Sequence, residues 1–147
     1  HLYGLREALD MITDEGVESV WARHATLARA IWAAADAWGE GGPLRLNIAN
    51  PAYRSHAVTT LEGGGEHGTG LRRWVEQNAG LTLGIGLGMG ADRGGESDGH
   101  FRIGHMGHVN VQMVMGALGT IEAGLKAIGV PHGPGGVSAA ADVIAAA

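Results

Sequence analysis

Glycine-rich breaks divide this chain into short segments, and their spacing restricts the fold more than any other feature of the sequence. There are 27 glycines among the 147 residues. They gather at residues 39–42, 63–70, 84–99 and 129–136, with prolines beside the first and last groups. Glycine and proline interrupt helices and strands. Because 147 residues is the length of one ordinary domain, we expect several short elements around a single core.

Five of the intervening segments place apolar residues at steps of three and four, which predicts amphipathic helices. They cover residues 2–15, 17–38, 69–78, 111–125 and 137–146, the last of them rich in alanine. Gly16 is expected to break or kink the first helical stretch, and Asn110 to cap the fourth helix. The chain starts at His1 directly in a helical pattern, as a segment of a longer protein would.

Four other segments have the pattern of short strands. Leu44, Leu46 and Ile48 alternate with polar residues, as in a strand that is buried on one face. Further strands are predicted at residues 57–61, 81–83 and 100–103. The resulting order of elements favours an α+β domain of two layers, with a mainly antiparallel sheet and helices on one side.

The bulk composition argues against several classes of function. The net charge is −5 and the basic residues are scattered along the chain, so a nucleic-acid partner is not expected. No apolar run approaches the roughly 18 residues of a membrane-spanning helix, so no membrane partner is expected. The absence of cysteine leaves no disulfide and no thiolate metal site, and it fits a cytoplasmic location.

The segment FRIGHMG, residues 101–107, carries the most specific signal for function. It sets Arg102 in a short apolar strand between a glycine-rich loop and a helix. A buried arginine needs an anionic partner, and its planar guanidinium pairs with a carboxylate through two parallel hydrogen bonds. If Phe101 and Ile103 face the core, Arg102 faces the opposite side, where a cleft would admit a carboxylate.

A structural role for Arg102 is the alternative. In that reading Arg102 lies at the surface or at the sheet edge and pairs with an acidic residue of the preceding loop. The acidic residues in reach along the sequence are Asp92, Glu96 and Asp98. The residues alone leave both readings open.

The motifs beside Arg102 give weaker signals. Residues 84–90 read G-x-G-x-G-x-G before a strand, whereas a dinucleotide-binding loop reads G-x-G-x-x-G before a helix. We therefore expect a mobile loop there, or one that passes close to a partner. The spacing of His100, His105 and His108 is not a usual zinc pattern, so no metal site is predicted. Instead, His105 is expected to point into the same cleft as Arg102, with the other two histidines at the surface.

Several segments, taken in order, resemble one known family. They are LYGLREAL (2–9), Glu15-Gly16, WARH (21–24), SHAVTT (55–60), Gly86–Gly88, FRIGHMG (101–107), GVPH (129–132) and GGV (135–137). Their order and distances resemble the C-terminal part of the class V, fold-type I aminotransferases, which use pyridoxal phosphate (PLP). The most similar branch holds the alanine–glyoxylate, serine–glyoxylate and serine–pyruvate aminotransferases. The resemblance covers nearly the whole chain and implies the small C-terminal domain of that fold.

The resemblance also implies roles for individual residues. The arginine of the family's R-I-G motif, here Arg102, binds the α-carboxylate of both the amino acid and the 2-oxo acid. The implied reaction moves an amino group from serine or alanine to glyoxylate or pyruvate. PLP is the implied cofactor, bound mainly by a large domain, and the implied assembly is a homodimer. His105 is expected beside Arg102 in the substrate-binding site.

The family's Schiff-base lysine has no counterpart in this chain, and neither has the aspartate that faces the pyridine nitrogen. The only lysine is Lys126, which the pattern places on a helix surface near Glu122. No catalytic residue is assigned, and the chain alone is expected to be inactive. Residues 1–130 are expected to form the small domain, with 1–38 leading in from the large domain, and 131–147 a tail helix.

Other functions remain open at this point. A pyridoxamine–pyruvate aminotransferase has a similar R-I-G-H-M-G segment and would use Arg102 to hold the oxo acid. A non-catalytic amino-acid-binding module and a purely structural oligomerisation domain are the alternatives outside the enzymes. Residues 92–99 are richer in glycine and acid than the family pattern, and are expected to form a flap over the substrate or a disordered stretch.

Overall fold

The structure, a computed structural model, describes residues 1–89 and 99–147. Its helices and strands are α1 (Leu2–Glu15), α2 (Val17–Gly39), β1 (Arg45–Leu46), the 3-10 helix η1 (Pro51–Tyr53), β2 (Val58–Glu62), α3 (His67–Ala79), β3 (Gly84–Ile85), β4 (His100–Gly104), α4 (Val111–Ala127) and α5 (Gly136–Ala145). The order of helices and strands agrees with the sequence-based expectation. The α+β class is therefore confirmed.

The four strands form one antiparallel sheet in the order β1-β2-β4-β3. The strand that sequence analysis placed at residues 81–83 is wrong, because β3 begins only at Gly84. The reason lies at the end of α3, where Gly80 takes a left-handed conformation with φ +65°. The Leu81 amide then donates to the Val75 carbonyl of that helix, and Leu83 turns into the core. Strand pairing starts only after this helix ending.

Helices cover one face of the sheet, and the two faces differ along each strand. Leu61 of β2 lies opposite Phe101 of β4, and both side chains are buried against the helices. Their neighbours Thr60 and Arg102 form the next pair and point to the other face, where they stay partly exposed. The period of two in a strand thus separates a core face from an open face.

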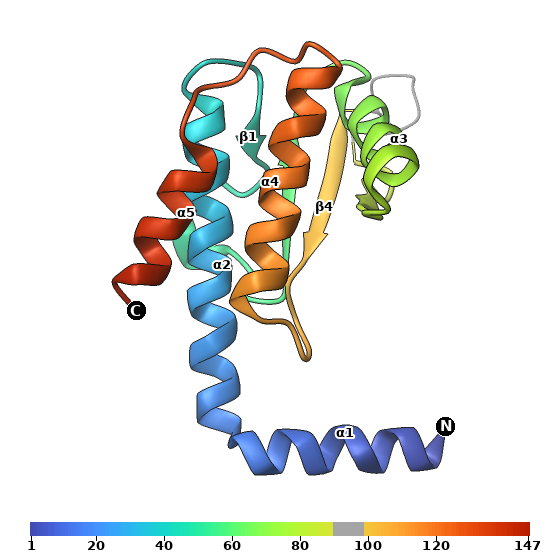
Figure 1. The fold of residues 1–147 in the computed structure, drawn as a ribbon, viewed down its shortest axis with the longest axis vertical. Helices are drawn as coiled ribbons and strands as arrows, with labels where there is room; N and C mark the ends of the chain where they lie inside the picture. The colour runs from blue at the N-terminus through green and yellow to red at the C-terminus, as the bar shows by residue number, and fades with distance from the viewer. Residues whose placement is uncertain (90–98) are drawn as a thin grey trace.

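Helix α5 shares the core with the elements before it. It packs along α2 and α4, as Figure 1 shows. Ala140 is fully buried, and Gly136 lies so close to the Trp38 indole that a Cβ atom there would overlap the ring. The predicted tail helix therefore packs as part of the domain core.

Helix α1 differs from the rest, because none of its residues is buried. It leaves α2 at a sharp angle and projects away from the sheet (Figure 1). Gly16 forms the elbow with φ +86°, a left-handed value that favours glycine. The expected break at Gly16 is confirmed. No helix of the described residues is both long enough and apolar enough to cross a membrane.

Candidate functional site

Arg102 lies at the centre of β4, with β2 on one side and β3 on the other. Its register partners are Thr60 in β2 and Gly84 in β3. The Arg102 Nε donates a hydrogen bond of 2.6 Å to the Ile85 carbonyl, which anchors the guanidinium over the edge strand. A long, mobile side chain is thereby held in one direction by the backbone of its neighbour.

The Arg102 guanidinium keeps donors for a further partner. Within residues 1–89 and 99–147, the bond to Ile85 is its only hydrogen bond, so neither Nη1 nor Nη2 has a partner in that part of the chain. These nitrogens form the planar fork that matches the two oxygens of a carboxylate. The alternative partners from sequence analysis, Asp92, Glu96 and Asp98, lie outside the described residues, as does the expected flap over 92–98.

Gly84 makes the position of the Arg102 side chain possible. A Cβ atom at Gly84 would lie 3.1 Å from the Arg102 Cβ and 3.3 Å from its Nε. The arginine therefore lies across the bare backbone of β3. Sequence analysis did not predict this contact, because the pairing of Gly84 with Arg102 joins residues 18 positions apart and no local pattern indicates it.

We expect Gly84→Ala to weaken carboxylate binding with little loss of stability. The added methyl group must push the Arg102 guanidinium away from the Ile85 carbonyl, whereas the edge strand itself stays exposed to solvent. Binding of a small 2-oxo acid to the two proteins would be compared by NMR titration. Gly104→Ala is the matched control, because a Cβ atom there meets nothing within 4 Å. Equal affinities for Gly84→Ala and the wild type would contradict this role.

His105 does not share a face with Arg102, and the expectation of a common cleft is corrected. Its side chain is fully buried on the core side of the sheet. The Nδ1 atom lies 3.1 Å from the His56 carbonyl and Nε2 lies 2.9 Å from the Thr59 hydroxyl. A three-residue offset along the strand places the two side chains on opposite faces.

The hydrogen bonds around His105 assign the hydrogen on its Nδ1. The His56 carbonyl only accepts, so Nδ1 must carry a hydrogen. Trp32 Nε1 donates to the Thr59 hydroxyl at 2.9 Å, which leaves that hydroxyl able to donate to Nε2 of a neutral ring. Burial lowers the pKa of His105 despite the opposing effect of the hydrogen bond to His56, and thereby favours the neutral form. The histidine is part of the fold's polar core.

A buried neutral His105 should make the domain less stable in mild acid. Its pKa in the folded protein lies below the ordinary histidine value of 6.5. The unfolded chain therefore binds a proton that the folded chain does not, and the free energy of unfolding falls as the pH drops below about 6.5. Urea unfolding at several pH values would show this slope, and His105→Gln should reduce it. The exposed His108→Gln is the control, and an equal slope in all three proteins would contradict the assignment.

The other histidines of the segment do not join Arg102 either. His108 is exposed, as expected, but His100 is largely buried, with Nε2 at 3.9 Å from Glu62 Oε2. The expected surface position of His100 is therefore wrong, because the start of β4 lies under the loop at Gly63. In the part of the chain that the structure describes, no three His, Asp or Glu side chains are placed to hold a metal ion.

The one lysine of the sequence is not placed to form a Schiff base with PLP. Lys126 is exposed on α4 and pairs with Glu122 at 2.7 Å. The hydrogen bond to that lysine lowers the pKa of the Glu122 carboxyl. A lysine in an exposed pair of this kind gives no buried amine for an imine bond.

The glycine run after β3 makes a turn in which the Met89 amide donates to the Gly86 carbonyl.

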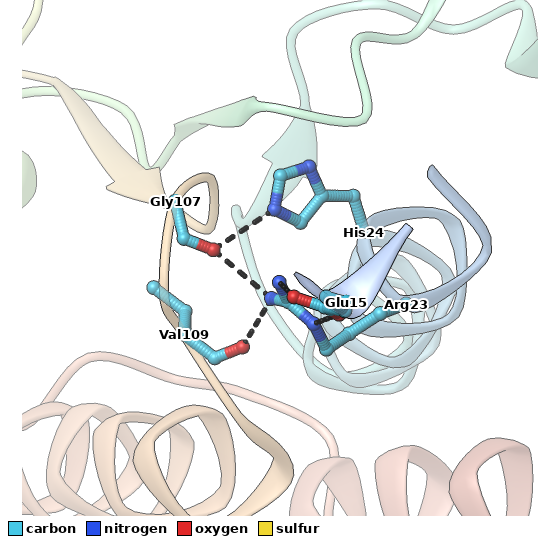
Figure 2. A network of polar contacts seen from close by, with 5 residues as sticks. All are labelled: Glu15, Arg23, His24, Gly107 and Val109. Carbon is cyan, nitrogen blue, oxygen red and sulfur yellow. Dashed lines mark hydrogen bonds and ion pairs between the residues drawn. The ribbon is translucent and has the colours of Figure 1, made fainter. Parts of the chain in front are cut away.

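A polar network ties the elbow of α1 to the loop after β4, and sequence analysis did not predict it. Figure 2 shows the Arg23 guanidinium between Glu15 and the Gly107 and Val109 carbonyls. His24 Nε2 lies 3.1 Å from the same Gly107 oxygen. These residues come from α1, α2 and the loop that follows Arg102. The only signal in the sequence was the WARH segment, which entered through its resemblance to the family.

The antiparallel sheet backed by helices is a small α+β domain that matches the fold of the class V aminotransferases. A solved structure, the pyridoxamine–pyruvate aminotransferase of Mesorhizobium loti, matches this fold with a TM-score of 0.82 and 31% identity. The match covers 97% of this chain and 35% of that one. No protein-family model matches the chain.

Among the curated relatives of the chain are two serine–glyoxylate aminotransferases. The serine–glyoxylate aminotransferase of Arabidopsis thaliana is 39% identical over 141 residues, which is 95% of this chain and 33% of the relative. The enzyme of that name in Methylorubrum extorquens is 37% identical over 147 residues, or 97% of this chain and 34% of the relative. The chain is a homologue of the C-terminal part of the serine–glyoxylate aminotransferases and their kin. It spans about a third of the length of these relatives.

Proposed function

We propose that this domain supplies the carboxylate-binding half of the active site of a PLP-dependent aminotransferase. The observation that carries the proposal is the Arg102 guanidinium, which is anchored through Nε and has no hydrogen-bond partner at either Nη atom among the described residues. Amino acids and 2-oxo acids differ in most of their groups but share the α-carboxylate. A rigid bidentate donor therefore orients both substrates of a transamination in the same way.

The proposed substrates follow from the relatives' names. The curated relatives act on serine and glyoxylate, so serine or alanine is the proposed donor and glyoxylate or pyruvate the acceptor. PLP carries the amino group between the two when the enzyme holds it. Because the one lysine of this sequence lies in an exposed pair with Glu122, we assign the Schiff-base lysine and most of the PLP binding to a large domain. We propose a cytoplasmic homodimer as the assembly.

A pyridoxamine–pyruvate aminotransferase is the second candidate. The structural match to the Mesorhizobium loti enzyme favours it, since that fold agrees over nearly the whole chain. Arg102 would then hold the carboxylate of the oxo acid alone, and the amino donor would be a pyridoxamine. A competition between serine and pyridoxamine as donors, in the enzyme joined to its large domain, separates the two candidates.

The carboxylate-binding role can be tested on the 147-residue chain itself. Glyoxylate would be titrated into labelled protein while the Nε–H resonance of Arg102 is followed by NMR. We expect a saturable shift of this resonance and of the backbone amides of β4, and the amide shifts should be lost in Arg102→Gln. Arg45→Gln is the matched control, since Arg45 is an exposed strand arginine that already pairs with Glu62 at 2.8 Å. A wild-type Arg102 resonance that does not move at any concentration contradicts the proposal.

A further inference from the structure

The Arg23 guanidinium makes four hydrogen bonds to three residues in two separate parts of the chain. Nε and Nη2 lie 2.6 Å and 2.7 Å from the two carboxylate oxygens of Glu15, the last residue of α1. Nη1 donates to the Gly107 carbonyl at 3.0 Å and to the Val109 carbonyl at 2.7 Å. In Figure 2 the guanidinium lies between the end of α1 and the loop that follows β4. One side chain thus bridges residues that are more than 80 positions apart.

Little else fixes the direction of α1. None of its side chains is buried, and Gly16 gives the elbow a backbone conformation without a side chain to brace it. A cavity of about 330 Å³ lies on the inner side of the elbow, lined by Ala8, Met11 and Met106 among others. Among the described residues, Glu15–Arg23 is the only ion pair that joins α1 to the rest of the domain. The polar network, rather than close packing, therefore sets the elbow angle.

The loop on the other side of Arg23 is short and fixed at both ends. At its start the His105 amide donates to the Ala57 carbonyl, and at its end the Asn110 side chain accepts from the Met113 amide. Gly107 in its middle has φ +83°. Arg23 holds this middle through two carbonyls, only a few residues beyond Arg102 in β4. A change at the elbow therefore reaches the loop through one guanidinium.

We propose that Arg23 is a positioning residue that couples the angle of α1 to the loop following the Arg102 strand. A change in the angle of α1 is then accompanied by a change in the conformation of residues 106–109. The consequence for Arg102 rests on the proposed function above, whereas the coupling itself does not. Neither Glu15 nor Arg23 touches the proposed carboxylate, so their effect on recognition is exerted through the loop.

The angle of α1 is measured directly by spin labelling. The sequence has no cysteine, so Glu7→Cys on α1 and Ala141→Cys on α5, both exposed, would carry the only two labels. Pulsed electron resonance should give one narrow distance for the parent protein. Arg23→Gln and Glu15→Ala should both broaden this distance distribution. Arg6→Gln is the control and should not broaden it, because the exposed Arg6 pairs with Asp10 of the same helix. A narrow, unshifted distance in Arg23→Gln overturns the proposal.

The coupling is measured in the loop. The amides of His108 and Asn110 follow the two carbonyls that Arg23 holds, so their nitrogen shifts report those hydrogen bonds. Glu15→Ala removes no hydrogen bond to the loop, but it also removes a carboxylate that interacts electrostatically with His108. The Asn110 amide is therefore the decisive probe, and we expect Glu15→Ala to shift it and speed its hydrogen exchange. If only Arg23→Gln does so, the two sides are independent and the coupling is refuted. Should Arg23→Gln fail to fold, Glu15→Ala provides both readouts.

A lysine variant separates positioning from simple charge. Arg23→Lys keeps the positive charge but has one nitrogen, which cannot reach both Glu15 oxygens and both carbonyls. We expect it to behave like Arg23→Gln in the distance and amide measurements, and wild-type behaviour would overturn the proposal. The glyoxylate titration of Arg102 is read separately. If the parent protein binds no glyoxylate although its label distance is narrow, the proposed function is contradicted. The coupling between α1 and the loop is then still supported.

Discussion

In the enzyme formed with a large domain, Arg102→Ala should raise KM for the amino acid and for the 2-oxo acid together. Both substrates offer the same carboxylate to the same guanidinium, so one substitution removes the contact from each half-reaction. Loss of one partner from a desolvated charge pair costs about 2–5 kcal/mol. That range corresponds to a rise in KM of roughly 30-fold to several thousand-fold. Steady-state kinetics with each substrate varied in turn would measure it.

Two further variants make that result specific to Arg102. Arg102→Lys should recover little of the loss, because an ammonium group cannot form the two parallel hydrogen bonds. Arg45→Ala, on β1 at the far edge of the sheet, should leave both KM values near the wild type. An Arg102→Ala enzyme with unchanged KM for either substrate would show that the carboxylate binds elsewhere.

The largest loss of stability is expected from Trp38→Ala. The indole is fully buried at the end of α2, and its Nε1 donates to Glu122 of α4 at 3.2 Å. Gly136 at the start of α5 packs directly against the ring. Removing a buried tryptophan costs about 3–5 kcal/mol, because the cavity left behind adds to the lost burial. Urea unfolding followed by circular dichroism would report the change.

Trp21→Ala is the matched control on the same helix. Trp21 is 66% exposed, so its truncation should change the unfolding free energy by no more than about 0.5 kcal/mol. The difference between the two variants isolates the contribution of burial from that of helix propensity, since both replace tryptophan by alanine in α2. Similar losses in the two proteins would contradict the described core.

Sequence patterns predicted the parts of this fold that depend on local spacing. The helix over residues 2–15 was predicted to its ends, and Asn110 caps α4 as expected, with its Oδ1 accepting from the Met113 amide. Alternation in FRIG also predicted that Arg102 would face away from the core. Each of these features is decided by residues within a few positions of one another, so the sequence carries the information directly.

Features decided by distant contacts were not predictable in the same way. His105 was expected beside Arg102, yet its burial depends on Thr59 and His56, almost fifty positions earlier. The role of Arg23 depends likewise on carbonyl groups of the loop after β4, which no side-chain pattern encodes. The position of β3 was missed because Leu81, in the segment that resembled a strand, hydrogen-bonds to the end of α3 instead of pairing in the sheet.

The alternation of side chains in β2 and β4 separates what holds the domain together from what it recognises. Leu61 and Phe101 are locked in the core, whereas Val58 and Thr60 lie partly exposed on the face of Arg102. Residues of that face are free to vary without opening a cavity. A library at Val58 and Thr60 should therefore yield folded proteins in which the group beside the carboxylate is selected anew, which makes this sheet a starting point for changing substrate preference.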